Sequence, residues 1–180
     1  MNIETAPIEG LLIITSDVFK DDRGVFMETF NSQILKDYGI PELMLQDNQS
    51  ISKKRVLRGL HFQAPPHAQG KLVRVISGSV LDVAVDLRKK SPTYGKWYSV
   101  LLSGENNRMF WIPEGFAHGF LALENDAIFA YKCTKLYNQE SERSLNWADP
   151  DLAINWGVAD PVLSEKDKIA PFFKDFISPF

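Results

Sequence analysis

The stretch Leu81-Asp82-Val83-Ala84-Val85-Asp86-Leu87 decides the fold class. Large apolar residues occupy every second position, and smaller or acidic residues stand between them. This period of two is typical of a β-strand with two different faces, whereas a helix would repeat every 3.6 residues. The stretch therefore predicts a strand in the middle of the chain.

Segments of the same kind lie on both sides of this strand. They are Lys71–Ile76, Trp97–Leu102, Met109–Ile112, Gly119–Leu123 and Ala127–Cys133. Turn-forming residues such as Ser77-Gly78, Ser103-Gly104 and Pro113-Glu114-Gly115 separate them. Strands at this spacing predict an antiparallel barrel or a double-sheet jelly roll. Helices are expected only at Ser32–Tyr38 and after Ser164, which opens a capping box with Asp167.

Composition limits the class of protein. The 180 residues include 20 Lys+Arg and 23 Asp+Glu, and the net charge of −3 argues against a nucleic-acid partner. No repeat or linker divides the chain, so we expect one domain over residues 1–180. Apolar runs such as Leu11–Ile14 are far too short for a membrane span or a signal-peptide core, so no membrane partner is expected. Cys133 is the only cysteine, which excludes an intramolecular disulfide and favours a cytoplasmic location.

The three histidines are His61, His67 and His118, and two of them, His61 and His118, fall in segments expected to be strand ends. His118 closes a Pro-x-Gly-x-x-His run over Pro113–His118 that resembles the second motif of cupin barrels. In metal-binding cupins this histidine is a ligand. Its partners are two histidines two residues apart and a glutamate seven residues before a glycine.

The first cupin motif is altered in this chain. Gln63 stands where the second histidine would be, and Lys71 stands seven residues before Gly78 in place of the glutamate. A lysine ammonium repels a divalent cation, so we expect no metal and no other cofactor. A fixed cation could stabilise an oxyanion in the metal's place. The alternative is that His61 and Lys71 merely lie at a barrel rim.

Several runs together resemble one family. They are Asp22–Gly24, Gln46–Asn48, Val56–Gln63, Ala68–Arg74, Asp82–Arg88, Trp111–Phe120, Tyr131–Thr134, Asn146–Pro150 and Leu163–Asp167. In order and spacing they are similar to the dTDP-4-dehydrorhamnose 3,5-epimerases, and the likeness extends from Phe19 to Pro171.

The resemblance implies an all-β fold, a cupin-like jelly-roll barrel with a few short peripheral helices. It also implies an isomerase that epimerises dTDP-4-keto-6-deoxy-D-glucose at C3 and C5. The product would be dTDP-4-keto-L-rhamnose, used for dTDP-L-rhamnose and cell-surface polysaccharide.

The same resemblance assigns four catalytic residues. His61 is the expected base, and Tyr131 is the expected proton donor. Lys71 would lie beside the C4 oxygen. Asp167 would fix the tautomer of His61, although a helix cap after Ser164 is the alternative reading of this aspartate.

Ten further residues match substrate-contacting positions of the family. They are Arg23, Glu28, Gln46, Asp47, Asn48, Arg58, His118, Tyr137, Glu142 and Lys166. Tyr137 matches an aromatic residue that stacks on thymine, and arginines suit a diphosphate because their planar fork binds two oxygens. Family members are dimers in which the Arg23 segment reaches the partner's pocket, so a homodimer is expected.

Three alternatives stay open at this point. The chain could be an epimerase that inverts C3 alone, a metal-dependent cupin enzyme, or a non-catalytic barrel that binds a sugar or a nucleotide. Gln63 and Lys71 count against the metal enzyme, and metal analysis of the purified protein separates that class from the others.

The tail over residues 172–180 carries four phenylalanines in nine residues and matches nothing in the family. Such a patch would be exposed in a bare monomer, so we expect it to dock against the barrel or a second subunit.

Overall fold

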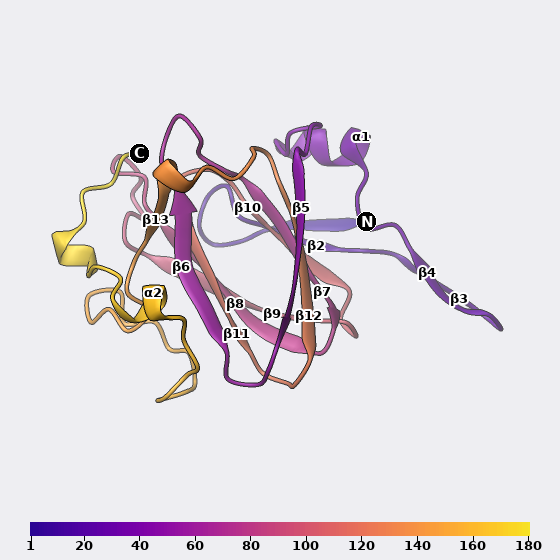
Figure 1. Cartoon of the computed structure of the whole chain (residues 1–180). Helices are drawn as coiled ribbons and strands as arrows, with labels where there is room; N and C mark the ends of the chain where they lie inside the picture. The colour runs from indigo at the N-terminus through magenta and orange to yellow at the C-terminus, as the bar shows by residue number, and fades with distance from the viewer.

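The computed structural model describes all residues, 1–180, and consists mainly of two antiparallel sheets that face each other (Figure 1). The six-stranded sheet has the order β1 (Asn2–Thr5), β2 (Leu12–Thr15), β10 (Arg108–Ile112), β7 (Lys71–Ser77), β12 (Ala127–Cys133) and β5 (Gln46–Ser52). The five-stranded sheet has the order β13 (Glu142–Ser144), β6 (Leu57–Gln63), β11 (Phe116–Ala122), β8 (Ser79–Asp86) and β9 (Trp97–Ser103). The predicted double-sheet, all-β architecture is confirmed.

The remaining elements are small. A hairpin is formed by β3 (Val18–Asp21) and β4 (Gly24–Met27), and the α-helices are α1 (Ser32–Leu35) and α2 (Glu165–Lys168). Short 3₁₀ turns cover Lys36–Tyr38, Gln139–Ser141 and Phe173–Asp175. None of these helices has the length and hydropathy that a membrane-spanning helix needs.

Each predicted strand exists, but the placement of two histidines at strand ends is wrong. His118 is the third residue of β11, because this strand begins at Phe116 and pairs with β8 at all seven positions. His61 is the fifth residue of β6, which continues to Gln63 because β13 pairs with its last three residues. The two histidines are direct cross-strand partners.

The main core lies between the two sheets and contains 16 buried residues. Phe129 of β12 stacks on Phe120 of β11 with ring centroids 4.1 Å apart, which joins one sheet to the other. Burying a side chain of this size stabilises the fold by about 1.5–3 kcal/mol.

Strand β8 is buried on both faces. Val83 and Val85 point into a second apolar cluster that includes Leu152 and Trp156 of the C-terminal segment. Ala84 belongs to the core between the sheets, and Asp82, on the same face of the strand, is also fully buried. The face of β8 that carries Asp82, Ala84 and Asp86 is therefore buried in the interior and does not face solvent.

The phenylalanine-rich tail docks against the outer side of the five-stranded sheet. The Phe62 ring of β6 contacts Phe176 and Phe180, with centroids 5.6 Å and 6.0 Å away. Phe173 joins the same apolar cluster. The first of the two expected docking modes, against the chain's own barrel, is confirmed.

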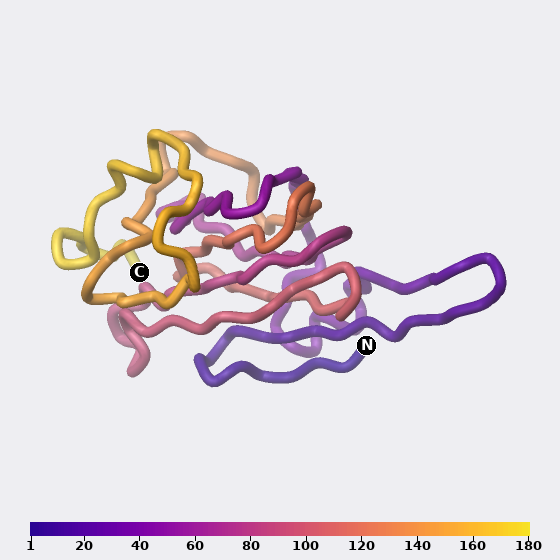
Figure 2. Tube along the Cα trace, turned by 90° about the horizontal axis from the view of Figure 1, so that it is seen from below, coloured from indigo at the N-terminus to yellow at the C-terminus, as the bar shows by residue number.

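Hairpin β3–β4 projects from the barrel on the side opposite the C-terminus (Figures 1 and 2). Phe19 and Phe26 pair across the hairpin and are 63% and 69% exposed. Two exposed aromatic side chains on one projecting hairpin are an unusual surface for an isolated chain.

Strands β6 and β11 approach each other closely at two glycines, where the register shifts between His118 and Phe120. A Cβ on Gly59 would lie 2.5 Å from the Cα of Gly119. Only glycine allows the two backbones to come this near.

We therefore expect Gly59→Ala to lower the free energy of unfolding by about 3 kcal/mol or more, because backbone atoms must move. Gly39→Ala is the matched control, since Gly39 also has a positive φ (+80°, against +135° for Gly59) but open space around its Cβ. It should cost about 1 kcal/mol. Urea unfolding of both variants measures the difference, and equal losses would contradict the close-approach argument.

Candidate active site

A cavity of about 470 Å³ lies between the two sheets. His61 and His118 reach it from the five-stranded sheet, and Lys71 and Tyr131 reach it from the six-stranded sheet. Asp167 of α2 and Arg58 of β6 are the other ionisable residues in its wall. The volume is in the range of ligand-binding pockets.

A second cavity of about 340 Å³ adjoins the first and shares its central residues, Asn48, His61, Lys71 and Tyr131. Beyond these shared residues it is lined by Gln46, Tyr137 and Glu142, among others. The two spaces form one elongated site with the shared residues at its middle.

His61 and Asp167 form a hydrogen-bonded pair 106 residues apart in the chain. His61 Nε2 lies 2.5 Å from Asp167 Oδ1, and the aspartate side chain is 3% exposed. Burial by itself would raise the pKa of Asp167, but the hydrogen bonds and charges of His61, Ser164 and Lys166 lower it below its ordinary value. The carboxylate is thus kept ionised beside the imidazole.

Asp167 makes both the helix cap and the contact with His61. Its backbone N–H donates to Ser164 Oγ at 3.2 Å, which is the helix cap. The Ser164 hydroxyl donates in turn to Asp167 Oδ2 at 2.8 Å, and this leaves Oδ1 for His61. The cap orients the carboxylate toward the cavity, so the cap and the histidine pair depend on the same serine.

His118 has a carboxylate partner of its own. Its Nε2 lies 3.0 Å and 2.9 Å from the two oxygens of Asp82, which is fully buried. Burial raises the pKa of Asp82 and lowers the pKa of His118. Asp82 was not among the expected site residues. The alternation of β8 places it on the same face as Ala84, and this face points into the space between the sheets.

Lys71 enters the cavity from the first position of β7, opposite Cys133 of β12. Its ammonium lies 5.9 Å from the centre of the Tyr131 ring. Burial lowers the pKa of Lys71, and the nearby carboxylates of Asp82 and Glu142 oppose this shift. The side chain is partly buried, and its charge therefore interacts more strongly with an anion formed in the cavity than it would in water.

Tyr131 is partly buried in the same wall and pairs with Asn48 of β5. Burial raises the pKa of Tyr131, and the charge of Arg58 opposes that shift. The side chain is therefore a neutral phenol near pH 7 and can donate a proton.

The arrangement suits proton transfer next to a carbonyl group. It places a histidine–carboxylate pair on one wall, and a phenol and a partly buried lysine side by side on the other. Enolate chemistry needs these three parts: a base, a proton donor and a stabiliser of the oxyanion.

Gln63 holds the loop that carries Tyr137. Its amide nitrogen donates to the carbonyl oxygens of His67 and Leu136, and its amide oxygen accepts from the backbone of Asn138 at 2.7 Å. The residue that replaces a cupin ligand is therefore a structural support in this chain. Tyr137 OH donates to Glu142 Oε2 at 3.0 Å, and Lys166 pairs with Glu142 at 2.5 Å.

Of the other expected contact residues, Arg58 also lines the larger cavity, but four line neither cavity: Arg23, Glu28, Asp47 and Lys166. The Arg23 side chain is 90% exposed at the hairpin and pairs with Asp21. Glu28 accepts from Asn31 Nδ2 at 3.2 Å, and Asp47 pairs with Lys132 on the outer face of the six-stranded sheet.

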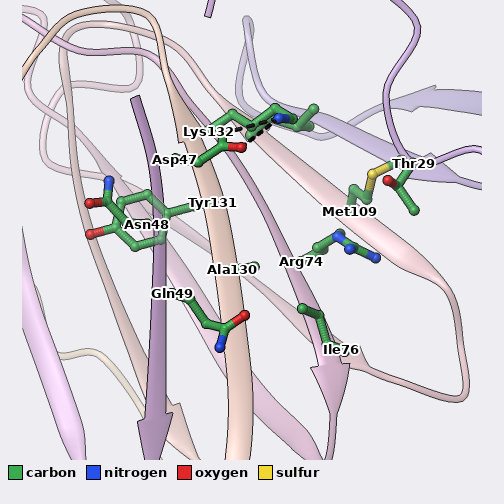
Figure 3. A pocket seen from close by; sticks show the side chains of 11 residues that line it. Thr29, Asp47, Asn48, Gln49, Arg74, Ile76, Met109, Ala130, Tyr131 and Lys132 are labelled. Carbon is green, nitrogen blue, oxygen red and sulfur yellow. Dashed lines mark hydrogen bonds and ion pairs between the residues drawn. The ribbon is translucent and has the colours of Figure 1, made fainter. Parts of the chain in front are cut away.

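That outer face carries a groove of its own (Figure 3). Arg74, Ile76 and Met109 lie on one side of strands β5 and β12, whereas Asn48 and Tyr131 lie on the other (Figure 3). The lining of the groove includes Tyr131 but no histidine, so histidine and phenol meet only in the cavity between the sheets.

Residues 5–175 match the family model described as dTDP-4-dehydrorhamnose 3,5-epimerase. The chain belongs to this family. It is 54% identical to the dTDP-4-dehydrorhamnose 3,5-epimerase of Methanothermobacter thermautotrophicus, over 89% of this chain and 88% of that one.

Two solved structures of epimerases agree with this membership. The enzyme of Elizabethkingia anophelis is 47% identical, with a TM-score of 0.93 over 97% of both chains. The dTDP-6-deoxy-D-glucose 3,5-epimerase of Legionella pneumophila, in complex with dTDP-4-keto-L-rhamnose, is 50% identical, with a TM-score of 0.92 over 96% of this chain and 93% of that one. The cupin-like barrel that the resemblance implied is confirmed.

Proposed function

We propose that this protein epimerises dTDP-4-keto-6-deoxy-D-glucose at C3 and C5, with residues 1–180 as one catalytic domain. The product is dTDP-4-keto-L-rhamnose, which supplies dTDP-L-rhamnose for cell-surface polysaccharide. The observation that carries the proposal is the His61–Asp167 pair, which faces Tyr131 and Lys71 across one cavity. The Legionella relative bound to dTDP-4-keto-L-rhamnose supports the choice of substrate.

The reaction begins with removal of a proton beside the C4 ketone. In our proposal His61 accepts it, because Asp167 keeps the ring nitrogen that it binds protonated and leaves the other nitrogen free. The aspartate then stabilises the imidazolium. As the proton leaves, negative charge moves to the C4 oxygen, and the Lys71 ammonium stabilises it there.

Inversion requires the new proton to arrive from the opposite face of the sugar. His61 belongs to the five-stranded sheet and Tyr131 to the six-stranded sheet, so the two side chains approach a ring held between the sheets from opposite walls. We assign Tyr131 as the donor. No step uses a metal or another cofactor, since both histidines already bind carboxylates and a lysine lies among them.

The remaining expected residues are proposed to bind substrate. Tyr137 stacks on thymine in the smaller cavity, with Gln46, Asn48, Glu142 and Lys166 around the nucleotide. Arg58 and His118 contact the hexose end of the substrate from the larger cavity. Asp47 contributes through its backbone, because its carboxylate is turned to the outer face.

We further propose a homodimer in which Arg23 and Glu28 serve the partner's site. Both lie outside this chain's own cavity, and the hairpin exposes Phe19 and Phe26 away from the barrel. Cys133 stays a free thiol, which suits the cytoplasm.

Removal of the Lys71 charge tests the oxyanion role. Lys71→Met keeps the apolar stem, and we expect kcat to fall about 10²–10³-fold, the typical loss for one oxyanion donor. The variant should unfold at the same or a higher temperature than the wild type, because a desolvated charge is gone. A normal kcat with only a raised KM would move Lys71 from catalysis to binding.

Deuterium wash-in from heavy water tests the two proton-transfer roles and the proposed function together. With dTDP-4-keto-6-deoxy-D-glucose, the wild type should incorporate deuterium and invert at both C3 and C5. His61→Ala should abolish exchange and inversion. Tyr131→Phe should exchange deuterium into recovered starting sugar with little inversion, since the base can return a deuteron to the same face.

Mass spectrometry and proton NMR read the label at each carbon. Exchange at C3 alone in the wild type would make the protein a C3-only epimerase. Normal inversion by Tyr131→Phe, or exchange by His61→Ala, would overturn the residue roles.

Mixing two impaired variants tests whether Arg23 acts across the dimer. His61→Ala and Arg23→Ala homodimers should each be weak or inactive. After subunit exchange, the mixed dimer has one site with an intact His61 and an intact Arg23 from the partner, so activity should return. If Arg23 acts within its own chain, both sites of the mixed dimer stay impaired and mixing restores nothing.

A further inference from the structure

Ser50 of β5 holds the one side-chain oxygen or nitrogen atom of the protein that is buried without a hydrogen-bond partner. This atom, Oγ, belongs to a residue that lines the larger cavity. Buried hydroxyls in folded proteins are nearly always hydrogen-bonded, and each exception calls for an explanation. A bound ligand that supplies the partner is such an explanation.

The position of Ser50 along the site shows which part of a ligand it can meet. On the inner face of β5, Gln46 lines only the smaller cavity, Asn48 lines both, and Ser50 lines only the larger one. Strand β12 repeats this order with Cys133, Tyr131 and Phe129. Both strands thus run from the smaller cavity, where we place the nucleotide, past the residues shared by the two cavities, to the far end of the larger cavity at Ser50 and Phe129.

The far end has apolar walls around this hydroxyl. Ser50 pairs across the sheet with Phe129, whose ring stacks on Phe120. The two flanking side chains on the same face of β5 already have partners: Ser52 accepts from Arg58 Nε at 3.2 Å, and Asn48 accepts from Gln46 Nε2 at 2.9 Å. The Ser50 hydroxyl is therefore the group still free to bind a neutral hydroxyl there.

We propose that Ser50 binds a hydroxyl group of the hexose ring and is a specificity-determining residue of the enzyme. This inference rests on the proposed function. With the base in the smaller cavity and the reacting carbons at the shared residues, only the hexose extends past His61, Lys71 and Tyr131 toward Ser50. The hexose of this substrate carries hydroxyls at C2 and C3, and one of them completes the hydrogen bonding of Ser50.

The test compares Ser50→Ala, Ser50→Thr and wild type by the rate of deuterium exchange at C5. We expect Ser50→Ala to lower kcat/KM about three- to tenfold, through KM, because one neutral hydrogen bond is lost from both ground and transition state. Ser50→Thr retains the hydroxyl and should recover most of this loss. The melting temperature of the free Ser50→Ala protein should be unchanged or higher, since no protein contact is removed.

Substrate analogues identify the bonded hydroxyl. For the 2-deoxy or the 3-deoxy analogue of dTDP-4-keto-6-deoxy-D-glucose, the difference between wild type and Ser50→Ala should vanish, because that analogue cannot make the bond. Ser99→Ala is the matched control: Ser99 is a partly buried serine of β9 outside both cavities and should change neither parameter.

An unchanged kcat/KM in Ser50→Ala would overturn the proposal, as would a loss that is equal for the substrate and both analogues. A lowered melting temperature with normal kinetics would make Ser50 a structural residue. A wild type that exchanges no deuterium would instead refute the proposed function, so the two failures are distinguishable.

Discussion

The ammonium of Lys71 lies between two β-sheets, and holding a charge there is the constraint on which the rest of the site depends. Burial disfavours the charged form. The protein offsets this cost with acidic groups on other strands, Asp82 of β8 and Glu142 of β13. Asp82 is in turn bonded to His118, so the cation, the second histidine and the buried carboxylate form one unit.

The His61–Asp167 pair depends on a different part of the chain. Asp167 comes from α2, outside both sheets, and the segment after α2 is tied to the barrel by backbone hydrogen bonds. Asn146 N donates to the carbonyl oxygen of Pro171 at 2.8 Å, and Phe173 N donates to Asp149 Oδ2 at 2.5 Å. On β6, Phe62 anchors the aromatic tail on the outer face while the adjacent His61 faces the cavity. Strand β6 therefore holds the C-terminal tail with one face and presents His61 to the cavity with the other.

Much of the fold could be predicted from the sequence, because the strands of the central region have a local period of two with turn residues between them. β12 was predicted with its observed bounds, and β7 and β9 to within one residue. The lengths of β6 and β11 were not predictable in this way. They depend on pairing with β13 and β8, and pairing between distant segments leaves no local pattern.

The sequence by itself, through its resemblance to the family, determined which residues are candidates for the chemistry of the site. His61, Lys71, Tyr131 and Asp167 are recognisable from the order and spacing of their motifs, and Lys71 in place of a carboxylate already argues against a metal. Only the tertiary structure decided which polar groups share an interior. In the sequence, Asp82 is one acidic position of an alternating strand, and Ser50 is one of several polar residues in β5. Neither position shows by itself that its side chain is buried. Their roles arise because closing two sheets over one cavity removes water from the inner faces, and each buried polar atom there must find a partner in another strand or in a ligand.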